Sequence, residues 1–319
     1  MRAATKTRVI FMGTSAFAVN SLQALAQVGH DIPLVVTQPD RPRGRGQQPA
    51  FSPVKEQALK LGLNLFQPER LRDSGVITKL TAIAPDFVVV ASYGQMIPEE
   101  ILILPNYCCL NIHASLLPRY RGAAPIQRAI MNGESMTGIT IMHMDKTLDT
   151  GDIILQQPLF MENDWNYSEV EDRLAMMGAA LLLDAIQQIM RGVASRIPQE
   201  NHLATYARRI LREDEYIDWR GSAVDIFNQI RALSPSPGAC SRLEHEGVKV
   251  FKAAIAKGLD SDLPPGSITA LTPGGFTVQT GSGQLELQSV QRSGKKRMDA
   301  KSFAAGQRLV PGKRFDEHM

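Results

Sequence analysis

The amino-acid sequence predicts an α/β protein of two domains, with a parallel sheet and its helices first and a smaller β-barrel after it. The chain has 319 residues, whereas a single core stops growing at roughly 250. Short apolar runs alternate with helical patterns up to residue 192, which is typical of βαβ units on a parallel sheet. Beyond residue 237 short alternating strands follow one another between Gly and Pro turns, which favours a small barrel of the OB type.

The first domain is expected to cover residues 1–192. Its predicted strands are short and apolar, at residues 8–12, 32–37, 86–91, 108–113, 138–144 and 152–161. The uninterrupted apolar run at 87–90 predicts a central strand that is buried on both faces.

Local signals predict where the helices of this domain begin and end. Helices are expected at residues 16–28, from 52 onward and at 168–190. Ser52-Pro53 is an N-cap followed by a first-position proline, and Ser168 with Glu171 makes a capping box. Gly29 and Gly192 supply C-terminal stops.

Residues 193–209 have no strong period and include Pro198, so we expect a linker there. The second domain is expected to cover residues 210–319, and Ser222 with Asp225 predicts a helix that runs to Leu233. The barrel strands are expected at 239–243, 248–254, 267–271, 276–280 and 284–290.

The composition is that of a folded, water-soluble chain, with 44% hydrophobic and 21% charged residues. The apolar run at 9–12 is shorter than the ~7 to 15 residues of a signal sequence, and no stretch approaches the ~20 needed to span a bilayer. We therefore expect a cytoplasmic protein with no membrane partner. No oligomerisation seam is visible, which favours a monomer. The three cysteines lack metal-type spacing, so we expect reduced thiols and no metal site.

The positive charge lies in the C-terminal third of the chain. The whole chain has a net charge of +3, and from Tyr206 onward 17 Lys and Arg stand against 13 Asp and Glu. This excess favours an anionic partner. The loop at 38–48 is also basic, and its Pro and Gly residues predict that it lacks regular structure.

Three polar residues could form a reacting centre. Asn111 and His113 are two apart near the end of a predicted strand, so their side chains share a face. Asp149 follows the next predicted strand, and ligands of open parallel sheets bind beyond the strand ends. Acyl transfer to an amine needs a donor for the developing oxyanion and a base for the amine proton. An amide, an imidazole and a carboxylate supply these groups.

The stretch from Asn111 to Pro125, together with Asp149-Thr150-Gly151-Asp152, resembles the 10-formyltetrahydrofolate-dependent formyltransferases, which share an Asn-x-His pair and a distant Asp. The wider resemblance, over essentially the whole chain, is to members that act on initiator methionyl-tRNA. It rests on Gly13–Ala18, the arginine loop, Ser52–Lys55, Tyr93-Gly94 with Pro98, and Ile217-Asp218-Trp219. Ser15 and Ser236 depart from it, since many relatives have Pro and Trp there. The resemblance implies a Rossmann-like N-terminal domain, an OB-like C-terminal domain, and formylation of the methionine amino group.

The resemblance also implies two sets of binding residues. The folate would contact Tyr93, Gly94, Gln95, Met96, Ile97, Ser115, Leu116, Leu117, Pro118, Met142 and Asp145. The tRNA would contact Arg41, Arg43, Arg45, Arg208, Arg209, Arg212, Lys295, Lys296 and Arg297, with Arg292 beside them. Arginines suit phosphate contacts because the guanidinium presents several donors in a fixed fork.

Three other functions fit parts of the sequence. A nicotinamide-dependent dehydrogenase would share the parallel sheet, but Gly13-Thr14-Ser15-Ala16-Phe17-Ala18 lacks the G-x-G-x-x-G fingerprint. A formyltransferase for a small amine would keep the reacting trio without needing the basic regions. An RNA-binding module would explain the basic barrel but not the trio.

Overall fold

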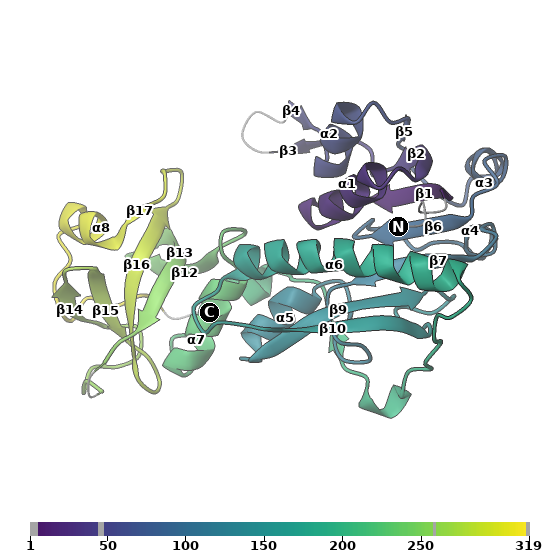
Figure 1. Ribbon diagram of the computed structural model, residues 1–319. Coiled ribbons are helices and arrows are strands. Elements are labelled where there is room, and N and C mark those ends of the chain that lie inside the picture. The colour runs from purple at the N-terminus through teal and green to yellow at the C-terminus, as the bar shows by residue number, and fades with distance from the viewer. Residues whose placement is uncertain (1–5, 44–47, 258–259, 317–319) are drawn as a thin grey trace. The chain divides into compact units, whose positions relative to one another are not determined.

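A seven-stranded sheet of order β10-β9-β7-β6-β1-β2-β5 forms the centre of the N-terminal part (Figure 1). The computed structural model describes residues 6–43, 48–257 and 260–316. The strands of this sheet are β1 (Arg8–Gly13), β2 (Asp31–Val36), β5 (Leu65–Phe66), β6 (Phe87–Ala91), β7 (Cys108–His113), β9 (Met136–His143) and β10 (Ile153–Phe160). β1 pairs in parallel with β2 and β6, β2 with β5, and β6 with β7. The predicted parallel sheet is confirmed, and β6 is buried along its whole length.

One strand of the sheet, β9, runs against all the others, which the sequence did not predict. β9 is antiparallel to β7, with Thr140 opposite His113 and His143 opposite Leu110, and β10 is antiparallel to β9. The expectation of another parallel strand at 138–144 is therefore wrong. Only nine residues separate β9 from β10, and a parallel pair needs a longer crossover connection.

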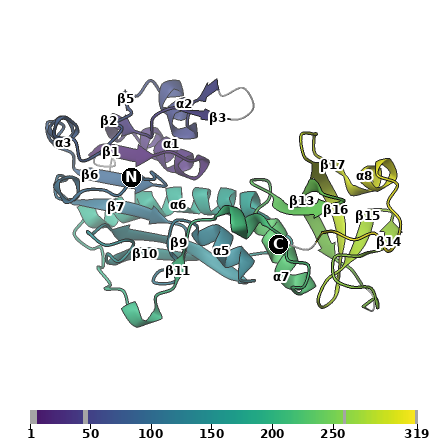
Figure 2. The same cartoon turned by 180° about the vertical axis from the view of Figure 1, so that it is seen from behind.

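Helices cover both the sheet and the barrel. They are α1 (Val19–Gln27), α2 (Pro53–Lys60), α3 (Ser74–Thr81), α4 (Glu99–Leu102), α5 (Pro125–Met131), α6 (Tyr167–Met190), α7 (Ala223–Ala232) and α8 (Ala300–Gly306), with 3₁₀ turns η1 (Ala16–Ala18), η2 (Asn201–Leu203) and η3 (Arg212–Glu215). Figures 1 and 2 show α6 lying along one face of the sheet. A Cβ at Gly178 of α6 would come within 2.9 Å of the side chain of Ile112, so helix and strand are in close contact.

α6 is long and apolar enough to cross a bilayer, with a mean hydropathy of 1.2 over its most apolar window. Its buried residues recur at helical spacing and include Leu174, Ala175, Leu182, Ala185 and Ile186. This is the packing of an amphipathic core helix.

Two predicted helix starts differ in detail from the structure. The first helix opens with a 3₁₀ turn at Ala16–Ala18 before α1 begins. α6 begins at Tyr167 rather than Ser168, because Asn166 is the capping residue. Its side-chain oxygen accepts hydrogen bonds from the Ser168 and Glu169 amides, and the Glu169 carboxylate accepts from the Asn166 amide. The cap at Ser52 is confirmed, since its hydroxyl accepts from the Lys55 amide.

The basic loop is partly regular, in contrast to the prediction. β3 (Arg41–Arg43) pairs with β4 (Gln48–Ala50), and Pro42 stands opposite Pro49. Prolines fit a two-stranded ribbon at a pair whose backbone amides are not hydrogen-bonded across it. The four residues between these strands, which include Arg45, lie outside the described part of the chain.

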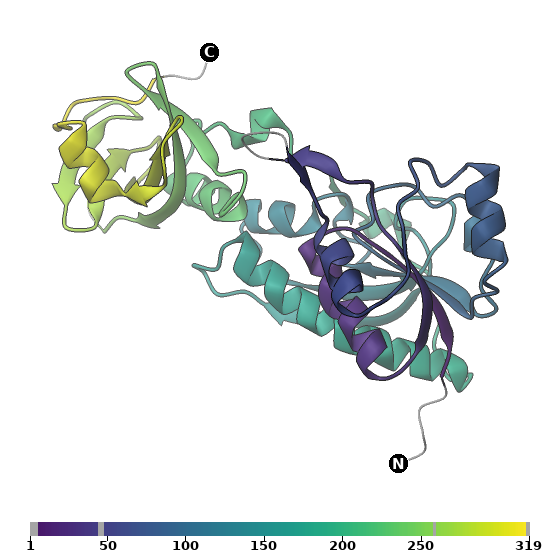
Figure 3. The ribbon, with the colours of Figure 1, turned by 90° about the horizontal axis from the view of Figure 1, so that it is seen from above.

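The C-terminal part contains the predicted antiparallel strands around one core (Figure 3). The sheet has the order β12-β13-β16-β15-β14, and β17 pairs with β16. The bounds are β12 (Ala239–Leu243), β13 (Glu246–Ile255), β14 (Ile268–Thr272), β15 (Gly275–Gln279), β16 (Gln284–Arg292) and β17 (Met298–Asp299). The segment at 313–316 joins the two edges, because Phe315 bridges to Leu243 and Arg314 bridges to Ser267. This closure makes the sheet a small barrel.

The chain forms two compact units that do not follow a single cut in the sequence. The first comprises residues 1–122, 136–160 and 171–206, and the second comprises 123–135, 161–170 and 207–319. α5 therefore belongs to the same unit as the barrel, where it contacts α7. The helix predicted at 222–233 is confirmed as α7, with the Ser222 hydroxyl accepting from the Asp225 amide.

The expected linker is attached to the first unit along much of its length. The backbone amide of Arg121 in β8 (Arg121–Gly122) donates to the Thr205 carbonyl at 2.8 Å, just before β11 (Tyr206–Ala207). Ile197 exchanges two backbone hydrogen bonds with Ile153 of β10.

Two buried threonines of β9 provide a matched test of the packing. Among the described residues, the Thr137 hydroxyl has no hydrogen-bond partner, whereas the Thr140 hydroxyl contacts the Ser115 carbonyl, the Leu117 amide and the Gln156 side chain. We expect Thr137→Val to raise the free energy of unfolding by about 1 kcal/mol, because an unsatisfied polar group is removed. Thr140→Val should lower the free energy of unfolding by about 1 to 3 kcal/mol, because the buried polar groups that bond to the Thr140 hydroxyl lose their partner. Urea denaturation measures both changes, and equal effects would contradict this account.

Candidate active site

β7 presents its alternate residues to the two faces of the sheet. Ile112 faces α6, where it lies against Gly178. Asn111 and His113 point to the opposite face because side chains alternate along a strand. The His113 ring is 5% exposed and so nearly excluded from water. The predicted shared face for these two residues is confirmed by this placement.

Asp149 meets both side chains from the segment between β9 and β10. Its Oδ1 accepts from Asn111 Nδ2 at 3.4 Å, and its Oδ2 lies 3.7 Å from His113 Nδ1. Oδ2 also accepts from the Gly122 backbone amide at 2.8 Å. β9 runs antiparallel, so Asp149 does not reach the pair from a parallel strand end as expected. The segment that follows β9 brings it there, with only 10% of the Asp149 side chain exposed.

The His113 ring is fixed from its other side. Nε2 lies 3.0 Å from the Tyr120 carbonyl oxygen, and a carbonyl can only accept, so Nε2 carries the hydrogen. In the neutral ring Nδ1 then has the lone pair, and it faces the Asp149 carboxylate. A proton taken at Nδ1 would give an imidazolium stabilised by a neighbouring negative charge.

The segment after His113 is held against β9. The Thr140 hydroxyl donates to the Ser115 carbonyl at 2.7 Å and accepts from the Leu117 amide at 3.1 Å. A Cβ at Gly138 would lie 2.5 Å from the Leu116 side chain, so glycine permits this approach. Residues 115–118 therefore form a constrained turn at the end of β7.

A second loop leaves the neighbouring strand β6 at the same sheet edge. The Tyr93 carbonyl accepts from the Thr14 hydroxyl at 2.9 Å and from Gln38 Nε2 at 3.2 Å. The order of the strands reverses between β1 and β6, which is where open sheets bind ligands. The Tyr93 side chain is 2% exposed, and burial raises its pKa to about 12.

The remaining predicted folate residues differ in exposure. Met142 lies opposite Asn111 on β9 and is 1% exposed, in contact with Leu117 and Ile153. Asp145 is exposed, and its carboxylate accepts from the Thr147 amide and the Thr150 hydroxyl. Its hydrogen bonds shape the segment that carries Asp149.

Comparison with known proteins identifies the family. The sequence profile described as "Formyl transferase" matches residues 6–186, and "Formyl transferase, C-terminal domain" matches 209–308. The chain is 43% identical to the methionyl-tRNA formyltransferase of Pelotomaculum thermopropionicum, over 96% of this chain and 97% of that protein. It belongs to the formyl transferase family.

A second relative and a solved structure are also similar to this chain. Identity to the methionyl-tRNA formyltransferase of Moorella thermoacetica is 46%, over 96% of this chain and 98% of that protein. The solved structure of HypX from Aquifex aeolicus in complex with tetrahydrofolic acid matches with a TM-score of 0.67 and 17% identity, over 94% of this chain and 47% of that one. This second likeness shows a shared fold.

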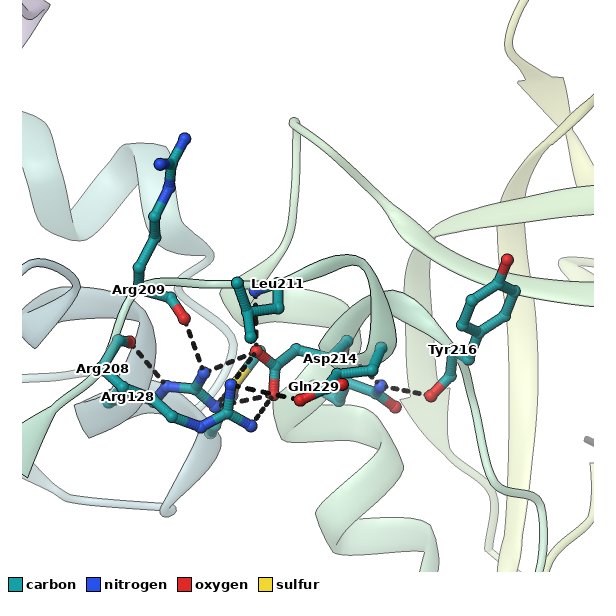
Figure 4. Close-up of polar contacts among 9 residues, drawn as sticks. Arg128, Arg208, Arg209, Leu211, Asp214, Tyr216 and Gln229 are labelled. Carbon is teal, nitrogen blue, oxygen red and sulfur yellow. Dashed lines mark hydrogen bonds and ion pairs between the residues drawn. The ribbon is translucent and has the colours of Figure 1, made fainter.

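In the second unit of this formyl transferase, a predicted tRNA contact is engaged in an ion-pair cluster (Figure 4). Asp214 accepts from Arg128 at 2.6 and 3.1 Å and from Arg208 at 2.7 and 3.0 Å. The Leu211 amide also donates to it. Arg128 in turn donates to the carbonyls of Arg208 and Arg209. Arg208 thus has a structural role that the sequence did not reveal, although 55% of its side chain is exposed.

The other predicted tRNA residues are exposed wherever the structure describes their side chains. These are Arg41, Arg209, Arg212, Lys295, Lys296 and Arg297. The Arg297 guanidinium lies 4.6 Å from the Phe251 ring, and Arg292 pairs with Glu246. Arg43 is placed in β3 by its backbone, and Arg45 lies outside the described residues. The structure brings the reacting trio together by direct contacts. Within the predicted folate set, it brings Met142 against Leu117.

Acid should weaken the Asp214 cluster. Burial would raise the pKa of Asp214, but hydrogen bonds from Arg128 and Leu211 and the two arginine charges outweigh it and lower the pKa. A lowered pKa stabilises the fold above the ordinary carboxyl range, and this contribution is lost as the pH falls through the folded-state value. We expect Asp214→Asn to cost roughly 2 kcal/mol near neutral pH and progressively less in acid. Urea denaturation against pH measures it, with the exposed Asp262→Asn as control. A constant difference down to strong acid would contradict this.

Proposed function

We propose that this chain transfers the formyl group of 10-formyltetrahydrofolate to the free amino group of methionine on initiator methionyl-tRNA. The product is N-formylmethionyl-tRNA for translation initiation. One observation carries the proposal, namely the Asp149 carboxylate within reach of both Asn111 and His113. Relatives that bear the name methionyl-tRNA formyltransferase, at 43% and 46% identity over 97% and 98% of their length, support the acceptor.

Asn111, His113 and Asp149 divide the chemistry between them. An amide nitrogen has two hydrogens, so Asn111 can hold Asp149 with one and donate the other to the formyl oxygen as its negative charge develops. The attacking ammonium must lose protons, and His113 Nδ1 and the Asp149 carboxylate are the acceptors that face each other there. The C–N bond to the acceptor forms as the bond to the folate nitrogen breaks, and that nitrogen leaves with a proton.

The loop after β6 suits a pterin. Gly94 is exposed with φ of +91°, and the Met96 side chain is 60% exposed. Exposed backbone groups beside an apolar side chain match a flat heterocycle with a hydrogen-bonding edge. We assign folate contact to residues 93–97 and 115–118, with Met142 and Asp145. When bound, the folate supplies the formyl carbon.

The remaining assignments follow the same proposal. Residues 1–192 would carry the reaction, and residues 210–319 would bind tRNA through their positive excess. Arg41, Arg43 and Arg45 would contact the acceptor end, because β2 leads into their loop from the sheet edge that carries the reacting trio. We place the protein in the cytoplasm as a monomer.

Removal of the donor or the imidazole should abolish most activity. We expect Asn111→Ala and His113→Ala each to reduce the rate of formyl transfer to methionyl-tRNA by at least ~10²-fold. Transfer of labelled formyl from 10-formyltetrahydrofolate measures this. Asn106→Ala and His245→Ala, which alter exposed residues of the same types, are matched controls.

Alternative acceptors decide the substrate class in the same assay. A wild-type protein that formylated glycinamide ribonucleotide or a nucleotide-linked amino sugar, but not methionyl-tRNA, would overturn the proposed acceptor. Near-normal rates in folded Asn111→Ala would overturn the role of the amide.

The basic loop should control the salt dependence of tRNA binding. Each phosphate neutralised contributes roughly −0.7 to −0.9 to the slope of log affinity against log salt. Replacing Arg41, Arg43 and Arg45 by alanine should flatten that slope by about 2 and weaken binding, while folate affinity survives. The control variant carries Lys60→Ala, Lys79→Ala and Arg191→Ala, which remove three positive charges elsewhere on the protein. If both triple variants change the salt slope equally, the loop contributes only to the net charge and makes no specific contact with tRNA.

A further inference from the structure

The backbone at Asp149 adopts a conformation that a non-glycine residue rarely takes. Its φ is +54°, in the left-handed region. A Cβ at Gly151 would lie 1.8 Å from the His143 carbonyl oxygen, so the same segment passes directly against the end of β9. Such a backbone persists only where its surroundings hold it. The residues that hold it are therefore informative about the site.

Gln199, in the stretch that the sequence predicted as a linker, is hydrogen-bonded to the segment that carries Asp149. Its Nε2 donates to the Asp149 carbonyl at 2.9 Å and to the Gly151 carbonyl at 2.8 Å. One side-chain amide thus joins the peptide units that follow Asp149 and Gly151. No catalytic motif marks Gln199 in the sequence, which is why sequence reasoning missed it.

A buried arginine fixes the orientation of that amide. Arg121 is 2% exposed, and its Nε and Nη2 donate to Gln199 Oε1 at 3.1 and 2.7 Å. Nη2 also donates to Asn201 Oδ1 at 2.9 Å. A guanidinium has donors and no acceptor. The Gln199 oxygen must therefore face Arg121, which turns its NH₂ group towards the Asp149 segment.

The residue after Arg121 also holds Asp149. The Gly122 backbone amide donates to Asp149 Oδ2, the oxygen that faces His113. Arg121 and Gly122 thus act on Asp149 by two routes, one through Gln199 to its backbone and one directly to its carboxylate.

We propose that Gln199 is a positioning residue for formyl transfer. Arg121 orients Gln199, and Gln199 holds the Asp149 carboxylate against Asn111 and His113. This inference rests on the proposed function for its effect on the reaction. The stretch at 193–209 then contributes to the reacting centre and is more than a spacer. Gln199 touches no reacting atom and acts through Asp149.

The positioning itself can be measured without the reaction. In Gln199→Leu both donated hydrogen bonds are lost while the side chain keeps a similar size. The Gly122 amide should then exchange its hydrogen at least ~10-fold faster, because its Asp149 acceptor is no longer held. The Leu117 amide, which donates to Thr140, is the internal control and should not change. Unchanged exchange at Gly122 would overturn the proposal.

A double-mutant cycle tests the effect on catalysis. We expect Gln199→Leu to lower kcat by about 10- to 100-fold, by analogy with residues that orient the ligands of metal centres, with KM for folate changed less than about threefold. In an Asp149→Ala background the same substitution should cost nothing further, because it acts through the missing carboxylate. If the fold-losses in kcat of Gln199→Leu and Asp149→Ala multiply in the double variant, the proposal is overturned. Gln187→Leu, an exposed glutamine of α6, is the control.

The two proposals fail in different ways. A wild-type protein with no formyl transfer to any acceptor would sink the proposed function, while the exchange of the Gly122 amide would still decide whether Gln199 holds Asp149. If Gln199→Leu does not fold, Gln199→Met replaces it, since its unbranched side chain fits the same space and also lacks the donors.

Discussion

The hydrogen bond from the Gly122 amide to the Asp149 carboxylate is the contact on which the reacting centre depends. It joins β8, which follows the turn after β7, to the segment between β9 and β10. Sheet pairing alone would not bring these two regions together. The carboxylate so held is the meeting point of Asn111 and His113, which share a face of β7 by strand geometry. Two of the three residues are therefore placed by regular secondary structure, and the third by a strained segment that needs external support. The support comes from the Gly122 backbone amide and from the side chains of Gln199 and Arg121, which touch no reacting atom.

The sequence predicts the part of the centre on β7 well, for a simple physical reason. Side chains two apart on a strand share a face, so the spacing of Asn111 and His113 was enough to pair them. The burial of β6 likewise follows from its apolar run. Capping at Ser52 and Ser222 was predicted because the signal lies within four residues. In each case the information is local, and the structure adds little beyond exact bounds.

The sequence does not predict features that depend on distant partners. The direction of β9 against β7 is not contained in its residue pattern, because an apolar strand has the same pattern in either direction. The pairing of β3 with β4 was hidden by prolines that occupy a pair without backbone hydrogen bonds. The roles of Gln199 and Arg208 depend on groups far along the chain, and a polar residue in an aperiodic stretch gives no sign of them. The left-handed backbone of Asp149 is likewise imposed by its neighbours.

The membership of α5 in the barrel unit has a consequence for the order in which that unit can form. A ribosome synthesises the chain from its N-terminus, so Arg128 is made 86 residues before Asp214, its carboxylate partner. During that interval the Arg128 guanidinium must stay hydrated, and α7 is not yet present to cover the α5 surface that it contacts in the folded protein. Long-range contacts of this kind slow folding, since a large loop must close before they form. A fragment beginning at residue 207 would lack this helix altogether, and would present to water the α7 surface that α5 covers.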